Sequence, residues 1–187
     1  MSVPIPPIPT APTTARTHWL KPLAQGSFWL CLVLTVYCLL QALVAIPLAA
    51  LPLWQHLASL AWEHGLDRTL WWMLVHPVSA SLLAALVCLA STLASWGLWH
   101  ERRWGLWAYV WALLLSALAN FVITWWFDRV LRQVFALIAD DPLMARELDM
   151  QRLMFTVTLL GSSVLFAGLQ GWLAWRLLRP DMRARFR

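Results

Sequence analysis

The sequence predicts an all-α integral membrane protein with four transmembrane helices in an antiparallel bundle and an extramembrane helical extension between helices three and four. Composition is the first reason, because 61% of the 187 residues are hydrophobic and only 12% are charged, whereas soluble domains carry about 25% charged residues. Four long apolar stretches are the second reason, since a helix needs about 20 apolar residues to cross a bilayer. Hydrocarbon offers the backbone no hydrogen bonds, so these stretches have to be helical.

The four apolar stretches contain no Asp, Glu, Lys or Arg. They are residues 27–54, 69–99, 104–127 and 153–175. The turn of residues 100–103 is so short that spans two and three must form an antiparallel hairpin. The segment of residues 54–68 is moderately apolar, which is typical of a segment that lies in the membrane interface.

The longest predicted loop, residues 128–152, carries helical signals of its own. Its apolar residues recur at helical spacing and predict an amphipathic continuation of span three: Val130, Leu131, Val134, Phe135 and Ile138. Asp141 can cap a new helix that has Pro142 at its first position. We therefore expect the fourth helix to run from Pro142 to Leu178, so that two long helices project from the outer face.

Two tails flank a membrane domain of residues 21–178. Residues 1–20 are rich in proline and lack the charged start of a signal peptide; they fit an extended tail that is either a flexible lead or a recognition segment. The basic tail, residues 179–187, lies next to a membrane helix, where basic residues bind anionic lipid headgroups rather than nucleic acid. The arginines expected at headgroups are Arg102, Arg103, Arg179, Arg183, Arg185 and Arg187.

Loop charge predicts that both termini lie in the cytoplasm. With the N-terminus inside, nine of the 14 Lys and Arg residues fall on the inner side and five on the outer side, which also holds seven carboxylates. Most of the 15 tryptophans fall near the ends of the spans, as in an aromatic belt. The Leu-, Ala- and Trp-rich chain, with its short Arg-Arg turn and Arg-rich tail, resembles small bacterial inner-membrane proteins in general.

His76 is the one residue in the spans that suggests a cofactor. It would serve as a ligand of haem or as part of a quinone site, but it lacks a paired histidine at matching depth, and an interfacial histidine is the competing interpretation. No cofactor or metal site is therefore predicted. The absence of charge within the spans also argues against proton-coupled transport and voltage sensing.

Small and polar residues recur along the faces of the spans, where they let helices approach closely and form hydrogen bonds. They hold one chain together or bind a helix of another protein, and the pattern does not separate these interpretations. We call them the seam residues: Gln41, Cys88, Ser91, Ser95, Ala112, Ser116, Asn120, Thr124, Ser163, Ala167 and Gly171.

The sequence lacks the residue arrangements of hydrolases, phosphate-binding loops and kinases, so we expect no catalytic residues. The leading hypothesis is a non-catalytic membrane subunit or accessory protein that packs against a larger membrane complex. The second is a homo-oligomeric pore or carrier for an uncharged or lipid-like substrate. The third is a haem- or quinone-binding redox protein that uses His76. The expected partners are the bilayer, anionic lipids and either another membrane protein or further copies of the chain.

Overall fold

The computed structural model describes residues 19–139, 141–184 and 186. Every regular element in these residues is an α-helix. The helices are α1 (Leu20–Ala49), α2 (Pro52–Glu63), α3 (Arg68–Val75), α4 (Pro77–Trp99), α5 (Arg103–Ile138), α6 (Pro142–Leu177) and α7 (Pro180–Arg183). The Pro-rich tail, apart from its last two residues, lies outside the described residues, as do Asp140, Arg185 and Arg187.

Within the described residues, α1, α4, α5 and α6 are long and apolar enough to cross a membrane. Helix α4 has 23 residues and helices α5 and α6 have 36 each. At 1.5 Å per residue these lengths are about 35 Å and 54 Å, against a hydrocarbon core of about 30 Å. Large apolar side chains cover their exposed surfaces. The chain is therefore a membrane-spanning protein, as the composition predicts.

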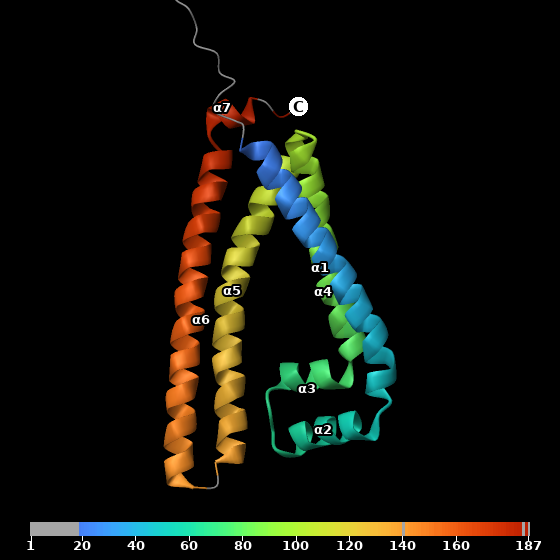
Figure 1. The fold of residues 1–187 in the computed structure, drawn as a ribbon, viewed down its shortest axis with the longest axis vertical. Coiled ribbons are helices and arrows are strands. Elements are labelled where there is room, and N and C mark those ends of the chain that lie inside the picture. Colours follow the sequence, from blue (N-terminus) through green and yellow to red (C-terminus); the bar gives the residue numbers. More distant parts are fainter. Residues whose placement is uncertain (1–18, 140, 185, 187) are drawn as a thin grey trace, which may run out of the picture.

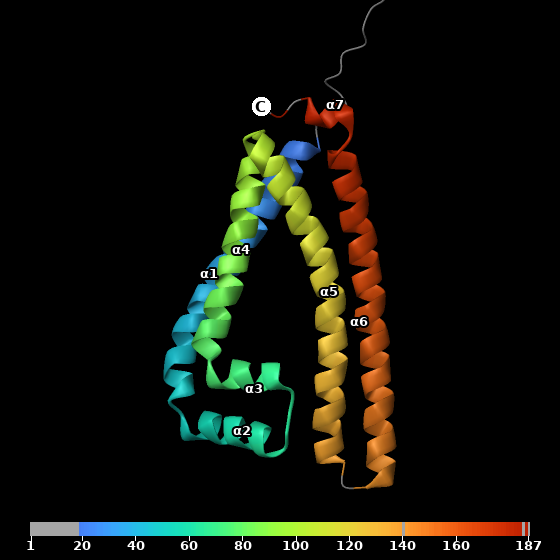
Figure 2. The same cartoon turned by 180° about the vertical axis from the view of Figure 1, so that it is seen from behind.

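The long helices form two pairs. Helix α1 packs along α4, and α5 packs along α6. The pairs converge at the end of the molecule that carries α7 and separate towards the other end, where α2 and α3 lie across the long helices (Figure 1). The view from behind shows the same separation (Figure 2). We call the converging end the apex and the other the open end.

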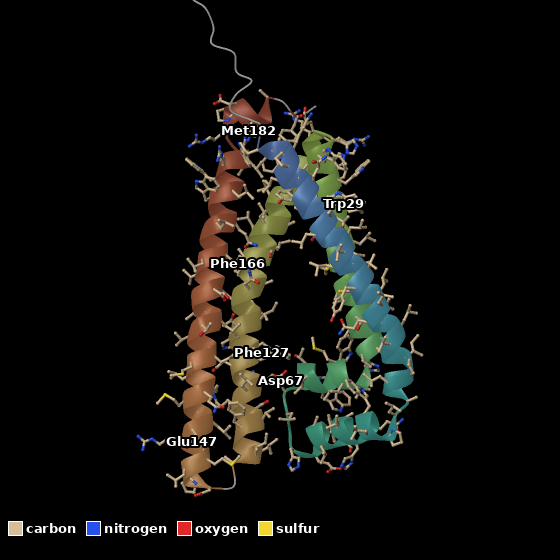
Figure 3. All side chains as sticks on the ribbon, in the orientation of Figure 1. Trp29, Asp67, Phe127, Glu147, Phe166 and Met182 are labelled. Carbon is tan, nitrogen blue, oxygen red and sulfur yellow. The ribbon has the colours of Figure 1, made fainter. Side chains whose placement is uncertain are left out.

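The main hydrophobic core lies at the apex, where all four long helices meet. Its most deeply buried side chains are Ala24, Leu98, Leu106 and Leu177. Leu20, placed in the N-terminal tail by the sequence, belongs to this core. Met182 and Phe186 of the C-terminal segment are also buried in it, and Met182 lies over the ends of the helices in Figure 3. The C-terminal segment is therefore packed against the helices, which its basic composition did not indicate.

The predicted second span is interrupted at His76. In place of one helix over residues 69–99, the structure has α3, a break, and α4 from Pro77. Proline has no N–H to continue the helix, and it disfavours helical geometry in the residue before it; His76 accordingly has φ −123° and ψ 56°. The first span also differs, since α1 begins at Leu20 and ends at Ala49, before Pro52 starts α2.

The long α5–α6 hairpin agrees with the sequence. Helix α5 continues past the apolar stretch to Ile138, and α6 begins at Pro142. Asp141 stands at the N-cap position, but its side chain makes no capping hydrogen bond, contrary to expectation. Because α5 is about 54 Å long and starts close to the apex, the hairpin extends well past a bilayer that α4 alone can span.

A close glycine contact joins α4 to α5 at the apex. A Cβ atom on Gly105 would collide with the backbone of Gly97, and a Cβ atom on Gly97 would lie 2.8 Å from the Gly105 Cα. The turn between the helices places Glu101 in the left-handed region, at φ 54°. The amide of Arg102 donates to the Gly97 carbonyl over 3.0 Å. This turn therefore fixes how α4 and α5 cross.

Candidate functional site

Helices α5 and α6 are joined by hydrogen bonds at three levels. Near the apex, Gln170 Nε2 donates to Ser116 Oγ over 3.2 Å. In the middle, the buried hydroxyls of Thr124 and Ser163 are 3.0 Å apart. Towards the open end, Thr156 Oγ1 donates to Asp128 over 2.9 Å. Three of the seam residues thus hold the hairpin together.

The contact between α1 and α4 is less polar. The buried hydroxyls of Thr35 and Thr92 are 3.5 Å apart, and each also donates to a carbonyl of its own helix. Ser95 is buried, and its hydroxyl donates to the Ser91 carbonyl over 2.9 Å. The sequence pattern missed Thr35, although it stands in a row of small residues that recur every three or four positions: Cys31, Thr35, Cys38, Ala42 and Ala45.

The remaining seam residues are not brought together in one site. Cys88, Ala112, Asn120 and Ala167 are half-buried. Gly171 faces open space, since a Cβ atom there would meet no described atom within 4 Å. Gln41 was expected to face another helix, of this chain or of another protein, and its side chain is exposed on the surface of α1. Helix packing places it about 100° around α1 from the buried Ala42, since successive residues turn by that angle.

At the open end, Asp67 connects the start of α3 to α5. Its carboxylate accepts hydrogen bonds from Trp126 Nε1 over 3.0 Å and from the Thr69 amide over 2.9 Å. Gln133 Oε1 accepts from the Asp67 amide over 2.9 Å, and Arg129 Nε lies 3.5 Å from the carboxylate. We call these residues of α3 and α5 the Asp67 cluster: Asp67, Trp126, Arg129 and Gln133.

The Asp67 cluster favours an ionised carboxylate. The hydrogen bond from the Trp126 indole holds the pKa of Asp67 below its ordinary value, with further help from the Thr69 amide against the opposing effect of burial. Asp67 and Phe127 lie on facing elements in Figure 3. Only the local contact of Asp67 with α3 has a signal in the sequence, since an Asp that precedes a helix is a common N-cap. Its distant partners on α5 are a product of the fold.

A second charged cluster lies at the same level of α5, on the side of α6. Arg132 Nη2 is 2.9 Å from Asp128 on the same helix. Arg152 Nε of α6 is 3.6 Å from Asp128. Asp128 thus lies just beyond the apolar stretch of α5, where charged residues are expected at a membrane interface.

Arginines at the apex lie over tryptophan rings. The guanidinium of Arg176 is 4.3 Å from the Trp19 ring centroid, and that of Arg179 is 4.1 Å from Trp175. Arg183 and Arg102 make similar contacts with Trp107 and Trp96. Arg103 begins α5 at the same end. The arginines predicted at headgroups that fall in the described residues therefore gather at one end of the molecule, together with interfacial tryptophans.

His76 lies at the junction of α3 and α4 and is exposed. Its ring centroid is 5.8 Å from that of Trp72. His76 therefore lies at the start of α4, whereas the predicted span of residues 69–99 would place it inside one continuous helix. In the parts of the chain that the structure covers, no three His, Cys, Asp or Glu side chains are grouped as metal ligands would be.

The tip of the α5–α6 hairpin exposes apolar side chains. Leu143 is 73% exposed, and Met144, Leu137 and Ile138 are also among the exposed large apolar residues. Glu147 lies beside them near the end of α6 (Figure 3). We call Leu137, Ile138, Leu143 and Met144 the hairpin tip. These residues stand at the far end of helices that are longer than a bilayer is thick.

Comparison with known proteins leaves the function to be argued from the structure. No family model, no curated protein and no solved structure matches this chain.

Proposed function

We propose that this protein is a non-catalytic integral membrane subunit or accessory protein that binds a larger membrane complex, with the hairpin tip as its main contact. The observation that carries the proposal is the exposure of apolar residues at the tip, with Leu143 73% exposed. Lipid can cover apolar residues within the bilayer, but residues beyond it face water. Exposed apolar patches in water are typical of protein interaction sites.

The helices that carry the tip are suited to such a contact. Hydrogen bonds at three levels join α5 to α6 along the hairpin, and the ion pair of Arg152 with Asp128 joins the two helices where α5 leaves its apolar stretch. A tip on a braced hairpin loses little conformational freedom when it binds, which favours association. The expected partner therefore presents an apolar groove outside the bilayer, at the level of the tip.

The proposal includes an orientation. The four spans form an antiparallel bundle in a bacterial inner membrane, with both termini in the cytoplasm and the hairpin tip on the outer side. The excess of Lys and Arg at the apex supports this orientation, as does the ring of arginines stacked on tryptophans there. Both α7 and the start of α1 lie at the apex (Figure 1).

Co-purification tests the tip as the contact. The full chain with a C-terminal tag is extracted in mild detergent, and bound membrane proteins are identified by mass spectrometry. The double variant Leu143→Ser/Met144→Ser should lose the partner that wild type retains, because it removes the exposed apolar side chains. The matched control Arg146→Ala/Glu147→Ala changes exposed polar residues next to the hairpin tip on α6 and should keep the partner.

Two outcomes contradict the proposal. Wild type that purifies as a homogeneous species without another protein excludes a stable complex. A partner that both double variants retain equally places the contact away from the hairpin tip.

A further inference from the structure

Helix α1 presents two polar side chains on its exposed side. Tyr37 is 61% exposed, and Gln41, one helical turn further on, is also exposed. Neither side chain has a hydrogen-bond partner within the residues that the structure describes. They continue a row of exposed residues spaced alternately by four and three positions, which we call the α1 row: Leu30, Leu34, Tyr37, Gln41 and Val44.

These two side chains lie close to the middle of the membrane. Helix α4, which spans the bilayer with 23 residues, has Cys88 as its central residue. The Thr35–Thr92 contact places Thr35 about 6 Å on the apex side of that centre, at 1.5 Å per residue. Because α1 starts at the apex, where α4 ends (Figure 1), Tyr37 and Gln41 fall within about 3 Å of the centre on either side.

An unpaired amide at this depth is unfavourable. Water is absent from the middle of the bilayer, and a polar group in hydrocarbon without a hydrogen bond carries a large desolvation penalty. Transmembrane helices with such residues associate so that the polar groups bond across the interface. The row next to the α1 row, which contains Val33, Leu40 and Leu43, has no polar side chain at this depth.

We propose that the α1 row binds the α1 row of a second copy of this chain. A glutamine side chain both donates and accepts hydrogen bonds, so two Gln41 amides that face each other across a two-fold axis satisfy one another. Such an axis along the membrane normal brings the same face of both copies together. The seven-residue repeat matches the packing of two supercoiled helices, and a polar amide such as Gln41 within it can set their register.

This dimer surface is separate from the hairpin tip. The α1 row lies inside the bilayer on the first pair of helices, whereas the tip lies beyond the bilayer on the second pair. The two contacts can therefore form independently, and each can fail without the other.

Cysteine cross-linking in membranes tests the dimer. The full chain is first made cysteine-free by replacing Cys31, Cys38 and Cys88 with Ser. Val44→Cys, on the α1 row, should then give a covalent dimer of twice the chain mass on oxidation. Leu43→Cys is the matched control, because it is one residue away and equally exposed, at 63% against 64% for Val44, but points about 100° around the helix. It should give little dimer.

A second substitution tests the role of the amide. Gln41→Leu, added to Val44→Cys, removes the hydrogen bonds but keeps the apolar bulk. It should weaken dimerisation in liposomes about 3- to 30-fold, the range for one interhelical polar contact. Gln41→Asn keeps an amide and should retain more of the dimer.

Three results would overturn the dimer: equal cross-linking at positions 43 and 44, a cross-linked product that contains another protein, or dimerisation that Gln41→Leu leaves unchanged. The Gln41→Leu variant should still co-purify with the partner bound by the hairpin tip. If the Val44→Cys chain with Gln41 intact forms no dimer while the partner is retained, only the α1 contact is contradicted. If the dimer forms and no partner is found, only the proposed function is contradicted.

Discussion

Single residues decide where the helices of this protein meet and where they part. Gly97 and Gly105 allow the backbones of α4 and α5 to touch, which no side chain would permit. Pro77 separates α3 from α4, because it removes a helical hydrogen-bond donor and restricts His76. In the last turn of α3, the Leu74 carbonyl accepts a hydrogen bond from Trp54 Nε1 over 2.7 Å.

The Gly105 contact makes a testable prediction at this scale. Gly105→Ala places a methyl group against the Gly97 backbone, so α4 and α5 have to move apart at the apex. We expect a loss of about 1–3 kcal/mol in stability, as for other overpacked sites, seen as a lower thermal transition in detergent. Gly168→Ala is the control, because its Cβ atom would meet no described atom within 4 Å. It should leave the transition unchanged or raise it slightly, since alanine favours helix. Equal transitions for both variants would show that the close contact is unimportant.

At the scale of elements, the C-terminal segment differs most from its composition. Its arginines predict contact with anionic lipid headgroups, and α7 and Phe186 in addition pack on the core where α1, α4, α5 and α6 converge. Basic residues and core packing can occur in the same segment because each guanidinium stays at the membrane interface over an indole ring. The neighbouring apolar side chains of the segment are then free to be buried.

The packed C-terminal segment predicts that one aromatic ring stabilises the apex. Phe186 is 5% exposed, and Phe186→Ala should lower stability by about 3 kcal/mol, as for other buried phenylalanines. Thermal unfolding of the purified protein measures the loss. Ala184→Ser, at an exposed position of the same segment, serves as the control and should have little effect. If deletion of residues 185–187 leaves the thermal transition temperature unchanged, the segment does not stabilise the core.

At the scale of the whole molecule, the two pairs of helices are held together at two places. One is the apex core, and the other is the Asp67 cluster, which joins α3 to α5 at the open end. Between these points the pairs separate (Figures 1 and 2). The apex core is apolar and insensitive to pH, whereas the Asp67 cluster depends on an ionised carboxylate.

The Asp67 cluster should therefore open in acid. The pKa of Asp67 in the folded protein is lowered. The stabilising effect of the cluster is therefore fully present above the ordinary Asp pKa of about 3.9 and is lost as the pH falls through the lowered pKa. Spin labels at Glu63→Cys and Ala136→Cys in the cysteine-free chain should report a narrow distance distribution at pH 7. That distribution should broaden towards longer distances as the pH is lowered below the ordinary Asp value of about 3.9.

A variant separates this effect from general acid unfolding. Trp126→Phe removes the indole donor and should broaden the same distribution already at pH 7. A control pair at Ala136→Cys and Arg146→Cys reports on α5 and α6, which the cluster does not join, and should stay narrow in both cases. An unchanged distance between positions 63 and 136 in Trp126→Phe would mean that the cluster does not hold the open end.

Part of the candidate site could be read from residue types and spacing. Thr124 and Ser163 were expected at helix contacts, and their hydroxyls are 3.0 Å apart. Gln41 was expected to face another helix too, but a periodic pattern shows only which residues share a face. It does not show whether the helix that faces Gln41 belongs to this chain or to another protein. Asp67 was missed as a connecting residue, because its partner Trp126 is 59 positions away and tryptophan at a span end has an interfacial explanation of its own.

The sequence by itself determined the four membrane-crossing helices and the long hairpin, because hydropathy, proline positions and helical spacing are local properties that hydrocarbon makes decisive. Only the tertiary structure decided that α1 pairs with α4 and α5 with α6, that the C-terminal segment joins the core, and that Gln41 points away from it. Lipid is as apolar as leucine, so hydropathy does not say which apolar face meets which. Which faces pack together is decided by close contacts such as Gly97 with Gly105 and by hydrogen bonds between residues far apart in the chain.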